Sequence, residues 1–173
     1  MSRLDGVTIH SEHPFWHADD ERDPLRRLRG RMAAPVTVLT AGSGRGRVGH
    51  TVSSVLLAEG EPAQVLALLD EESEVWAAEP ERIVVNVLGP THAWLAEVFA
   101  GTAPAPGGPF TQGEWTDSRW GPVLADAAGW IGIRVVDAAP ARAGWFPVLA
   151  GDVEHVHVGG GDALAHVRGR FQH

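Results

Sequence analysis

Short apolar runs of strand length are the feature that most constrains the fold of this 173-residue chain. They are rich in Val, Ile, Leu and Thr, and breaks containing Gly or Pro separate many of them. Strands and helices do not alternate in the rhythm of a parallel sheet. The sequence therefore predicts a mainly β protein, an antiparallel β-barrel of roughly six strands with a few short helices. The runs lie at 35–40, 55–58, 64–69, 82–88, 129–136, 146–158 and 163–167.

Three short helices are expected between these runs. Asp23 precedes the first, Asp70 or Ser73 caps the second over 74–79, and Thr91 caps the third, which ends at Phe99. The segment 109–120 is aromatic but irregular. The first helix has an apolar stripe, and its other faces are basic, either as a solvated surface or as a phosphate contact. The basic residues are Arg22, Arg26, Arg27, Arg29 and Arg31.

The chain reads as one domain with a leading arm. Residues 1–20 show no clean periodicity, and we expect an extended arm there, followed by a single domain over 21–173. His13 and His17 in this arm have the spacing of a helical metal site. Pro14 between them argues against a helix and therefore against that site.

Composition excludes several functions. The absence of cysteine removes disulfides and thiolate chemistry, and every basic residue is arginine, which removes a P-loop lysine. A net charge of −8 argues against nucleic-acid binding. No apolar run approaches the ~20 residues of a membrane helix, and the first residues lack the apolar stretch of a secretory signal. We expect a cytoplasmic protein that contacts neither membranes nor nucleic acid.

A cluster of hydroxyl groups follows the first strand. In Gly49-His50-Thr51-Val52-Ser53-Ser54, extended geometry puts Thr51 and Ser53 on one side of the chain and Ser54 on the other. Hydroxyls with backbone N–H groups can bind an anion without lysine. An ordinary turn rich in Ser and Thr is the alternative.

The other motifs in the sequence are less informative about function. His155 and His157 share a strand face, and a metal site forms if His166 sits on the strand paired with theirs. A hairpin end with exposed histidines is the alternative. The closely spaced glycines at 42–46 lack the Gly-x-Gly-x-x-Gly order and fit a hairpin loop. No Gly-x-Ser-x-Gly elbow is present.

Taken together, the motifs resemble those of the flavin reductase-like family, whose fold is the FMN-binding split barrel. The resemblance spans about 25–171 and keeps the motif order. Its segments are Arg31-Met32-Ala33-Ala34-Pro35-Val36-Thr37-Val38-Leu39-Thr40, Gly49-His50-Thr51-Val52-Ser53-Ser54, Val84-Val85-Asn86-Val87-Leu88, Leu95-Ala96-Glu97-Val98-Phe99-Ala100-Gly101, Gly121-Pro122-Val123-Leu124, Gly151-Asp152-Val153 and 164–171.

The resemblance implies a homodimer that binds FMN, or FAD, and reduces flavin with NADH or NADPH for a partner monooxygenase. No protein acid or base is required for hydride transfer to a flavin. His50 stands where the family has Met, and Trp145 stands where it has the His of a Gly-Asp-His motif on the nicotinamide side. The alternative is a flavin-binding sensor or carrier without turnover. The implied flavin contacts are Pro35, Val36, Thr37, Thr51, Val52, Ser53, Ser54, Ser73, Phe99, Ala100 and Phe110, with His50 and Trp145 beside the rings.

Overall fold

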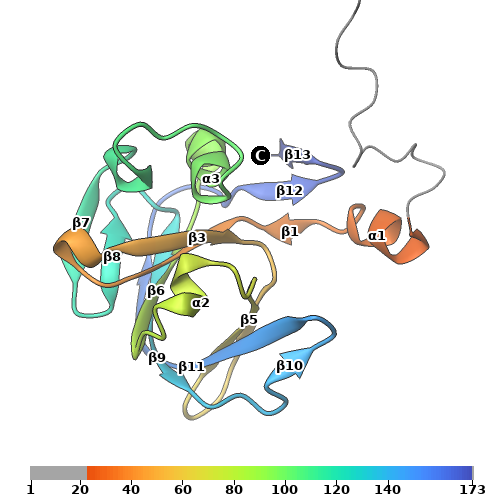
Figure 1. The fold of residues 1–173 in the computed structure, drawn as a ribbon, viewed down its shortest axis with the longest axis horizontal. Helices are drawn as coiled ribbons and strands as arrows, with labels where there is room; N and C mark the ends of the chain where they lie inside the picture. The colour runs from red at the N-terminus through yellow and green to blue at the C-terminus, as the bar shows by residue number, and fades with distance from the viewer. Residues whose placement is uncertain (1–22, 173) are drawn as a thin grey trace, which may run out of the picture.

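A curled antiparallel sheet forms the body of the protein (Figure 1). The computed structural model describes residues 23–172, so the predicted arm at 1–20 lies outside the described residues. The strand order is β3-β2-β6-β9-β11-β5-β4, and β10 pairs with β11. The prediction of a mainly β, antiparallel fold with few short helices is confirmed. The strands are β2 (Thr37–Ala41), β3 (Val48–Val52), β4 (Val55–Ala58), β5 (Gln64–Leu68), β6 (Arg82–Val87), β9 (Gly129–Val136), β10 (Arg142–Ala143) and β11 (Phe146–Val158).

The order of the strands explains why the sheet curls. β3 and β4 occupy opposite ends of the order, yet only Ser53 and Ser54 join them. Three Cα–Cα steps span at most about 11 Å, so the two edges of the sheet must come together at this link. The hydroxyl cluster therefore lies at the seam of the barrel.

Smaller elements surround the barrel. β1 (Ala34–Pro35), β12 (Ala165–Val167) and β13 (Arg170–Gln172) form a separate three-stranded sheet, and β7 (Trp115–Ser118) pairs with β8 (Gly121–Leu124). The helices are α1 (Pro24–Arg29), α2 (Glu74–Ala77) and α3 (Ala93–Phe99), with single 3₁₀ turns η1 (Gly44–Gly46), η2 (Pro90–His92) and η3 (Pro109–Thr111).

Three local predictions were wrong. His166 lies on β12, which pairs with β1 and β13, and not on a strand beside β11. The third helix has His92 at its N-cap, not Thr91, because Pro90 starts a 3₁₀ turn ahead of it. Segment 109–120, expected to be irregular, contains β7.

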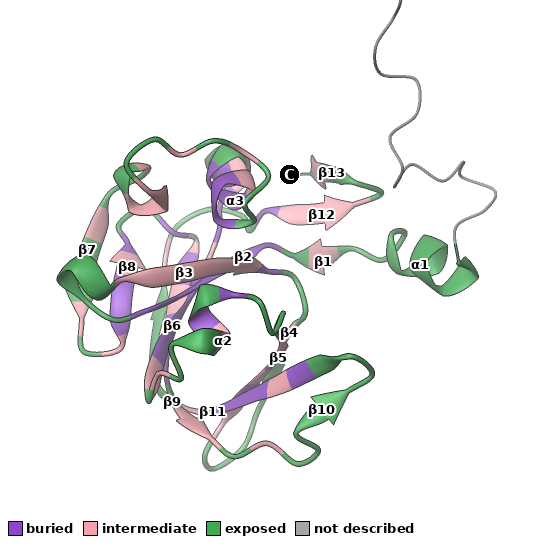
Figure 2. Ribbon diagram, in the orientation of Figure 1, coloured by how far each residue is buried: buried purple, intermediate pink, exposed green. Residues whose placement is uncertain are grey.

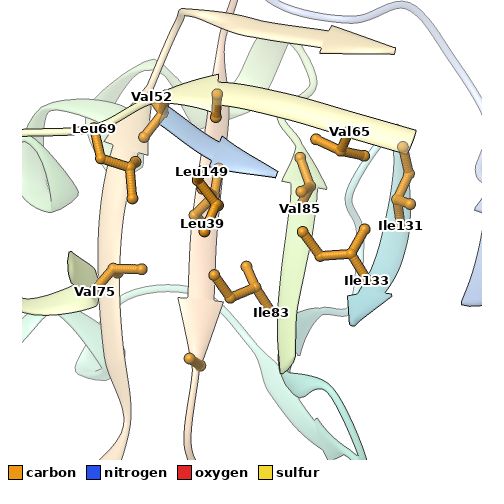
Figure 3. Packing of buried hydrophobic residues seen from close by; sticks show 12 residues of the cluster. Leu39, Val52, Val65, Leu69, Val75, Ile83, Val85, Ile131, Ile133 and Leu149 are labelled. Carbon is orange, nitrogen blue, oxygen red and sulfur yellow. The ribbon is translucent and has the colours of Figure 1, made fainter. Parts of the chain in front are cut away.

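The barrel interior is one apolar cluster closed by α2 (Figures 2 and 3). Val75 of α2 is fully buried in it, and Ser73 caps that helix by accepting the Trp76 N–H at 3.3 Å. Burial of branched aliphatic side chains is the main stabilising contribution here. The cluster comprises Leu39, Ala41, Val52, Val65, Ala67, Leu69, Val75, Ile83, Val85, Ile131, Ile133 and Leu149.

A second core lies on the outer face of β2, under α3 (Figure 2). Side chains of a strand alternate between faces, so Val36 and Val38 point into this core while Leu39 points into the barrel. β2 is therefore buried on both sides along its whole length, including Thr37 and Thr40.

Asn86 ties three strands together at the centre of this outer face. It is fully buried, and its Nδ2 donates to Val38 O at 3.2 Å and to Thr40 Oγ1 at 3.1 Å. Its Oδ1 accepts the Leu124 N–H at 2.9 Å. The polar residue that interrupts the apolar run of β6 thus fixes β2, β6 and β8 to one another.

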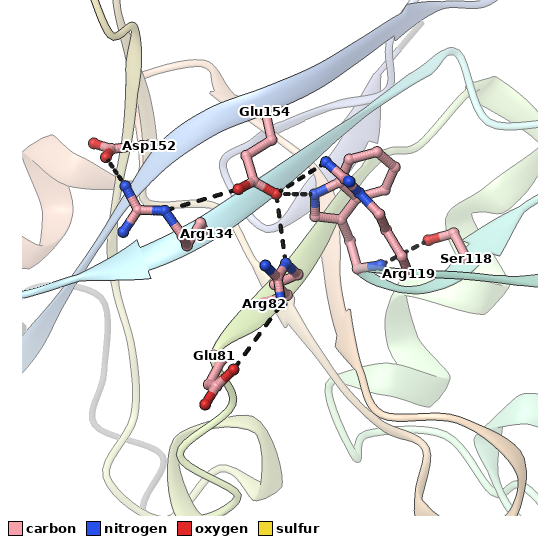
Figure 4. A network of polar contacts seen from close by, with 8 residues as sticks. Glu81, Arg82, Ser118, Arg119, Arg134, Asp152 and Glu154 are labelled. Atoms are coloured by element: carbon pink, nitrogen blue, oxygen red, sulfur yellow. Dashed lines mark hydrogen bonds and ion pairs between the residues drawn. The ribbon is translucent and has the colours of Figure 1, made fainter.

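Glu154 organises the exposed face of β9 and β11 (Figure 4). Its carboxylate accepts the Trp120 indole N–H at 2.8 Å, and the Arg119 guanidinium lies 4.3 Å from the Trp120 ring centre. These contacts fasten the turn between β7 and β8 to the barrel. Arginines lie 3.3, 3.5 and 3.7 Å from Glu154 oxygens: Arg119, Arg82 and Arg134.

Candidate functional site

The two faces of β3 carry different parts of the predicted site. Thr51 faces α3, and its hydroxyl donates to Ala96 O at 2.7 Å. His50 lies opposite Leu39 in the ladder and so shares the inner face with it. Burial lowers the pKa of His50, while the negative charges of Asp70 and Glu74 oppose that shift. His50 is therefore a half-buried imidazole at the end of the barrel that α2 covers.

An aromatic cluster supports the outer face of β3. The Phe99 ring packs edge-on against Phe110 at 5.0 Å and Trp115 at 5.4 Å between ring centres. A Cβ on Gly49 would lie 2.6 Å from the Phe99 ring, so only glycine allows this close packing. Phe99 is 3% exposed, so exposed Ala100 at the end of α3 is the residue of this pair that a ligand could reach. Trp115 was not among the predicted residues, because it lies outside every motif that was recognised in the sequence.

The hydroxyls of the predicted site are mostly engaged with the main chain. Thr37 donates to Val52 O at 2.6 Å, Ser54 to Leu68 O at 2.8 Å and Ser73 to Asp70 O at 2.7 Å. Ser53 is exposed, and its hydroxyl has no hydrogen-bond partner within 23–172. The prediction that these groups contact flavin stays a prediction.

The segment around Trp145 lies at the same end of the sheet as Ser54. Ser54 O accepts the Leu68 N–H, and the next amide, that of Leu69, donates to Pro147 O. Strands are spaced about 4.8 Å apart, so Ser54 and Pro147 lie on the order of 10 Å apart. Trp145 itself is 88% exposed.

Arg142 holds this segment in place. Its guanidinium pairs with Glu71 and donates to Trp145 O. The contact joins two loops that are distant in sequence, and no local pattern around either residue marks it. The ion pair and the pairing of β10 with β11 together hold Trp145 at this end of the sheet.

The remaining predicted residues line the first strands without forming a pocket of their own. Val36 and Val52 are buried in the two cores, at 2% and 4% exposure, so their side chains belong to the fold. Pro35 is exposed on β1. Pro35 is therefore the one of these three residues that a ligand could reach.

A cleft of about 450 Å³ lies elsewhere, at the start of α3. Within it, His92 Nδ1 accepts the Gly89 N–H at 3.0 Å, and His92 Nε2 lies 3.1 Å from Asp126 Oδ2. Both ring nitrogens are thus occupied, which leaves no nitrogen for proton transfer to a ligand. The cleft is lined by Thr91, His92, Trp94, Leu95, Gln112, Gly113, Glu114 and Asp126.

The three histidines considered for a metal do not meet. His155 packs against Trp130 with 4.5 Å between ring centres, whereas His166 packs against Phe171 in the small sheet. Within 23–172, no three His, Asp or Glu side chains gather as a metal site would require.

The model of the flavin reductase like domain matches residues 29–173. The chain belongs to the flavin reductase-like family. Two relatives support this: the FMN reductase (NADH) RutF of Variovorax paradoxus is 33% identical over 78% of this chain and 75% of its own length. The reductase component of a 4-nitrophenol 4-monooxygenase/4-nitrocatechol 2-monooxygenase from Rhodococcus opacus is 30% identical over 88% of this chain and 81% of its own length.

A solved structure agrees on the fold of this flavin reductase-like chain. The NADH:FAD oxidoreductase SgcE6 of Streptomyces globisporus, in complex with NAD and FAD fragments, superposes with a TM-score of 0.74. The match covers 86% of this chain and 90% of that chain at 22% identity. Among the described residues, the helices are all too short or too polar to cross a bilayer.

Proposed function

We propose that this protein is an NADH:flavin oxidoreductase that takes FMN and delivers reduced flavin to a partner monooxygenase. The observation that carries the proposal is the matching family domain over 29–173, built on the barrel seam that bears the hydroxyl cluster. The names of the relatives, an FMN reductase (NADH) and the reductase component of a monooxygenase, support the cofactor, the reductant and the kind of partner.

The residues at the seam suit a flavin. When bound, flavin supplies the hydride-accepting chemistry, so the protein has only to hold and orient the reactants. Backbone of β3, at one edge of the strand order and packed between the barrel core and α3, would present the ring with a rigid surface. The oxygens of Thr51 and Ser54, held by their bonds to Ala96 O and Leu68 O, would contact the polar tail.

Anaerobic mixing tests the proposal. We expect NADH to bleach the visible absorbance of flavin in the presence of the protein, with NADPH as the comparison nucleotide. A flavin carrier without turnover is the second candidate, because a fully exposed Trp145 stands where the family has His. Flavin binding without bleaching by either nucleotide would favour the carrier.

We also propose a homodimer, supported by an apolar patch on the outside of the sheet. Leu56, Leu66, Ala150 and Val136 lie opposite one another in one row across four strands. This row is on the face opposite the barrel core, which contains Val65, Ala67 and Leu149. Leu56 is 68% exposed, and a second copy related by two-fold symmetry would cover it.

Light scattering after size-exclusion chromatography tests the dimer. Leu56→Glu should shift the mass from dimer to monomer, because a charge would be buried in the patch. Glu97→Gln, on half-buried α3 and away from this row, is the control and should leave the mass unchanged. A monomeric wild-type protein would contradict the proposal.

The proposal also covers the bounds of the catalytic domain and the cellular location of the protein. Residues 21–173 form the catalytic domain, and the protein works in the cytoplasm, where NADH is supplied to reductases of this kind. Detection of activity in a variant that begins at Glu21 would support this division, and loss of folding in that variant would contradict it.

A further inference from the structure

The apolar stripe of α1 is left uncovered by the rest of the described chain. Leu25, Leu28 and Met32 are three and four residues apart and so lie on one side of α1 and of the turn that follows it. Their side chains are 71%, 59% and 64% exposed, and Figure 2 shows α1 exposed along its whole length. Large apolar side chains that gather on a surface indicate a contact with another molecule.

α1 is also too short to be stable without such a contact. It has six residues, none of which is buried, and a helix of that length forms poorly in water without tertiary packing. Its start is capped by Asp23, and its end is held by Gly30 O, which accepts the Arg168 N–H at 2.6 Å. These bonds hold the two ends of α1, so packing against its apolar stripe has to come from another molecule.

The charge around the stripe narrows the kind of surface that fits it. Four arginines flank the stripe, all are exposed, and none forms an ion pair with a residue within 23–172. A basic surface with an apolar stripe binds best to an acidic surface with an apolar centre. The four are Arg26, Arg27, Arg29 and Arg31.

α2 and the residues on either side of it form an acidic surface. Segment 70–81 has six acidic residues and no basic one, and all six are exposed. Glu71 pairs with Arg142, and Glu81 lies 4.0 Å from Arg82. The other four have no ion pair within the described part of the chain: Asp70, Glu72, Glu74 and Glu79.

This acidic surface has an apolar centre. Ala77 and Ala78 are exposed and lie between Glu74 and Glu79 in the sequence. Their small side chains allow the large side chains of the α1 stripe to approach closely. The surface around α2 therefore matches α1 both in charge and in the placement of its apolar residues.

α1 does not reach the α2 of its own molecule. Figure 1 shows α1 beyond β1, to one side of the barrel, whereas α2 lies on the barrel itself. The segment that carries α1 is fixed in that place, because Ala34 pairs with His166 and Gly30 O is bonded to the Arg168 N–H. The acidic surface is thus available to the α1 of another copy.

We infer that α1 of each protomer docks on the acidic surface around α2 of a second copy, its apolar stripe against Ala77 and Ala78 and its arginines beside the carboxylates. Two-fold symmetry forms this contact twice, since each copy carries both surfaces. The inference rests on the proposed homodimer. It identifies a contact between protomers that is separate from the patch containing Leu56.

Engineered cysteines test the contact without background, because the chain has no cysteine of its own. A tagged Leu28→Cys protein is co-expressed with an untagged Ala77→Cys protein, or with Ala78→Cys, and the purified pair is oxidised. A disulfide requires Cα atoms within about 7 Å of each other. We expect a mixed disulfide between tagged and untagged chains in at least one of the two pairs.

Leu28→Cys co-expressed with Glu59→Cys is the matched control. Glu59 is exposed between β4 and β5, outside the acidic surface, so this pair should give no mixed disulfide. Equal yields in the control and in the two test pairs would overturn the inference, because the reaction would then reflect random collision.

Charge reversal tests whether the arginines and carboxylates take part. Arg26→Glu with Arg27→Glu, added to the tagged chain, should lower the yield of mixed disulfide about fivefold or more. Glu72→Arg with Glu74→Arg, added to the untagged chain, should then restore it. All four side chains are exposed and lie outside the cores, so the variants keep the fold. A yield that does not respond to either reversal would overturn the inference.

The outcomes separate this inference from the proposed function. A wild-type protein that is dimeric by light scattering, with no mixed disulfide in either test pair, would overturn the docking of α1 alone and would favour a different acidic protein as its partner. A monomeric wild-type protein would overturn both the homodimer and the docking. Bleaching of flavin by NADH is measured separately and bears only on the assignment as a reductase.

Discussion

Replacing Asn86 by alanine should destabilise the protein severely. Asn86 is completely buried between β2, β6 and β8. Its amide donates to Val38 O and Thr40 Oγ1, and its carbonyl accepts the Leu124 N–H at 2.9 Å. No water can reach the site to replace these partners.

The magnitude follows from those contacts. Each of three buried hydrogen bonds contributes about 0.5–1.5 kcal/mol net, and the orphaned Leu124 N–H costs a further ~1–3 kcal/mol. The lost bond from Leu124 and the cost of its unpaired N–H count part of the same interaction, so the two contributions do not add in full. We therefore expect a loss of about 3–5 kcal/mol in the free energy of unfolding. That is a large fraction of the ~5–15 kcal/mol typical of a domain.

Urea unfolding followed by tryptophan fluorescence measures the loss, since the chain contains 7 tryptophans. Gln112→Ala is the control, because its side chain makes one long bond at 3.4 Å on the surface. We expect the control to change stability by less than about 0.5 kcal/mol. A loss below about 1 kcal/mol for Asn86→Ala would refute the role of Asn86 as the link between three strands.

Three further predictions concern the packing and the titrating groups. The hydrogen bond from Trp120 lowers the pKa of Glu154, and Arg82 and Arg119 add to this shift. Ionised Glu154 therefore stabilises the fold above its ordinary pKa of 4.5, and this stabilisation is lost as pH falls through the pKa that Glu154 has in the folded protein. Urea midpoints of wild type and Glu154→Gln should therefore differ at neutral pH and converge in acid, and a constant difference would contradict this. Burial lowers the pKa of His50 below 6.5, so the stability of the wild type should fall as pH drops below 6.5. His50→Met should flatten this dependence of stability on pH, and parallel pH profiles for the two proteins would exclude the effect. A Cβ on Gly132 would lie 2.5 Å from the Trp120 ring, so Gly132→Ala should cost about 1–3 kcal/mol, while Gly160→Ala, with open space around it, should change stability little; equal thermal midpoints for the two would contradict the packing.

The strands could be predicted from sequence because their signal is local. β-Branched runs placed β5, β6, β9 and β11 within one or two residues of the observed bounds, and of the two predicted caps, Asp70 and Ser73, it is Ser73 that caps α2. Thr91 failed as a cap because a 3₁₀ turn at Pro90 moved the start of α3 by one residue beyond it. A capping residue predicts the end of a helix only where no neighbouring turn competes for the same residues.

Long-range contacts explain what the sequence did not reveal. Pairing of β12 with β1, which removed His166 from the other histidines, joins residues more than 100 positions apart. The Thr51 hydroxyl, predicted as a donor to a ligand, already donates to Ala96 O, which is 45 residues away in the sequence. The sequence could identify which hydroxyls gather at the seam, but not where their protons point.

Hydride transfer itself is the most direct test of the account. Anaerobic mixing of the protein, flavin and one equivalent of NADH should bleach one equivalent of flavin, and deuterium at the transferred position of NADH should slow the bleaching. Unchanged flavin absorbance with both NADH and NADPH, in protein that binds flavin, would contradict the assignment as a reductase.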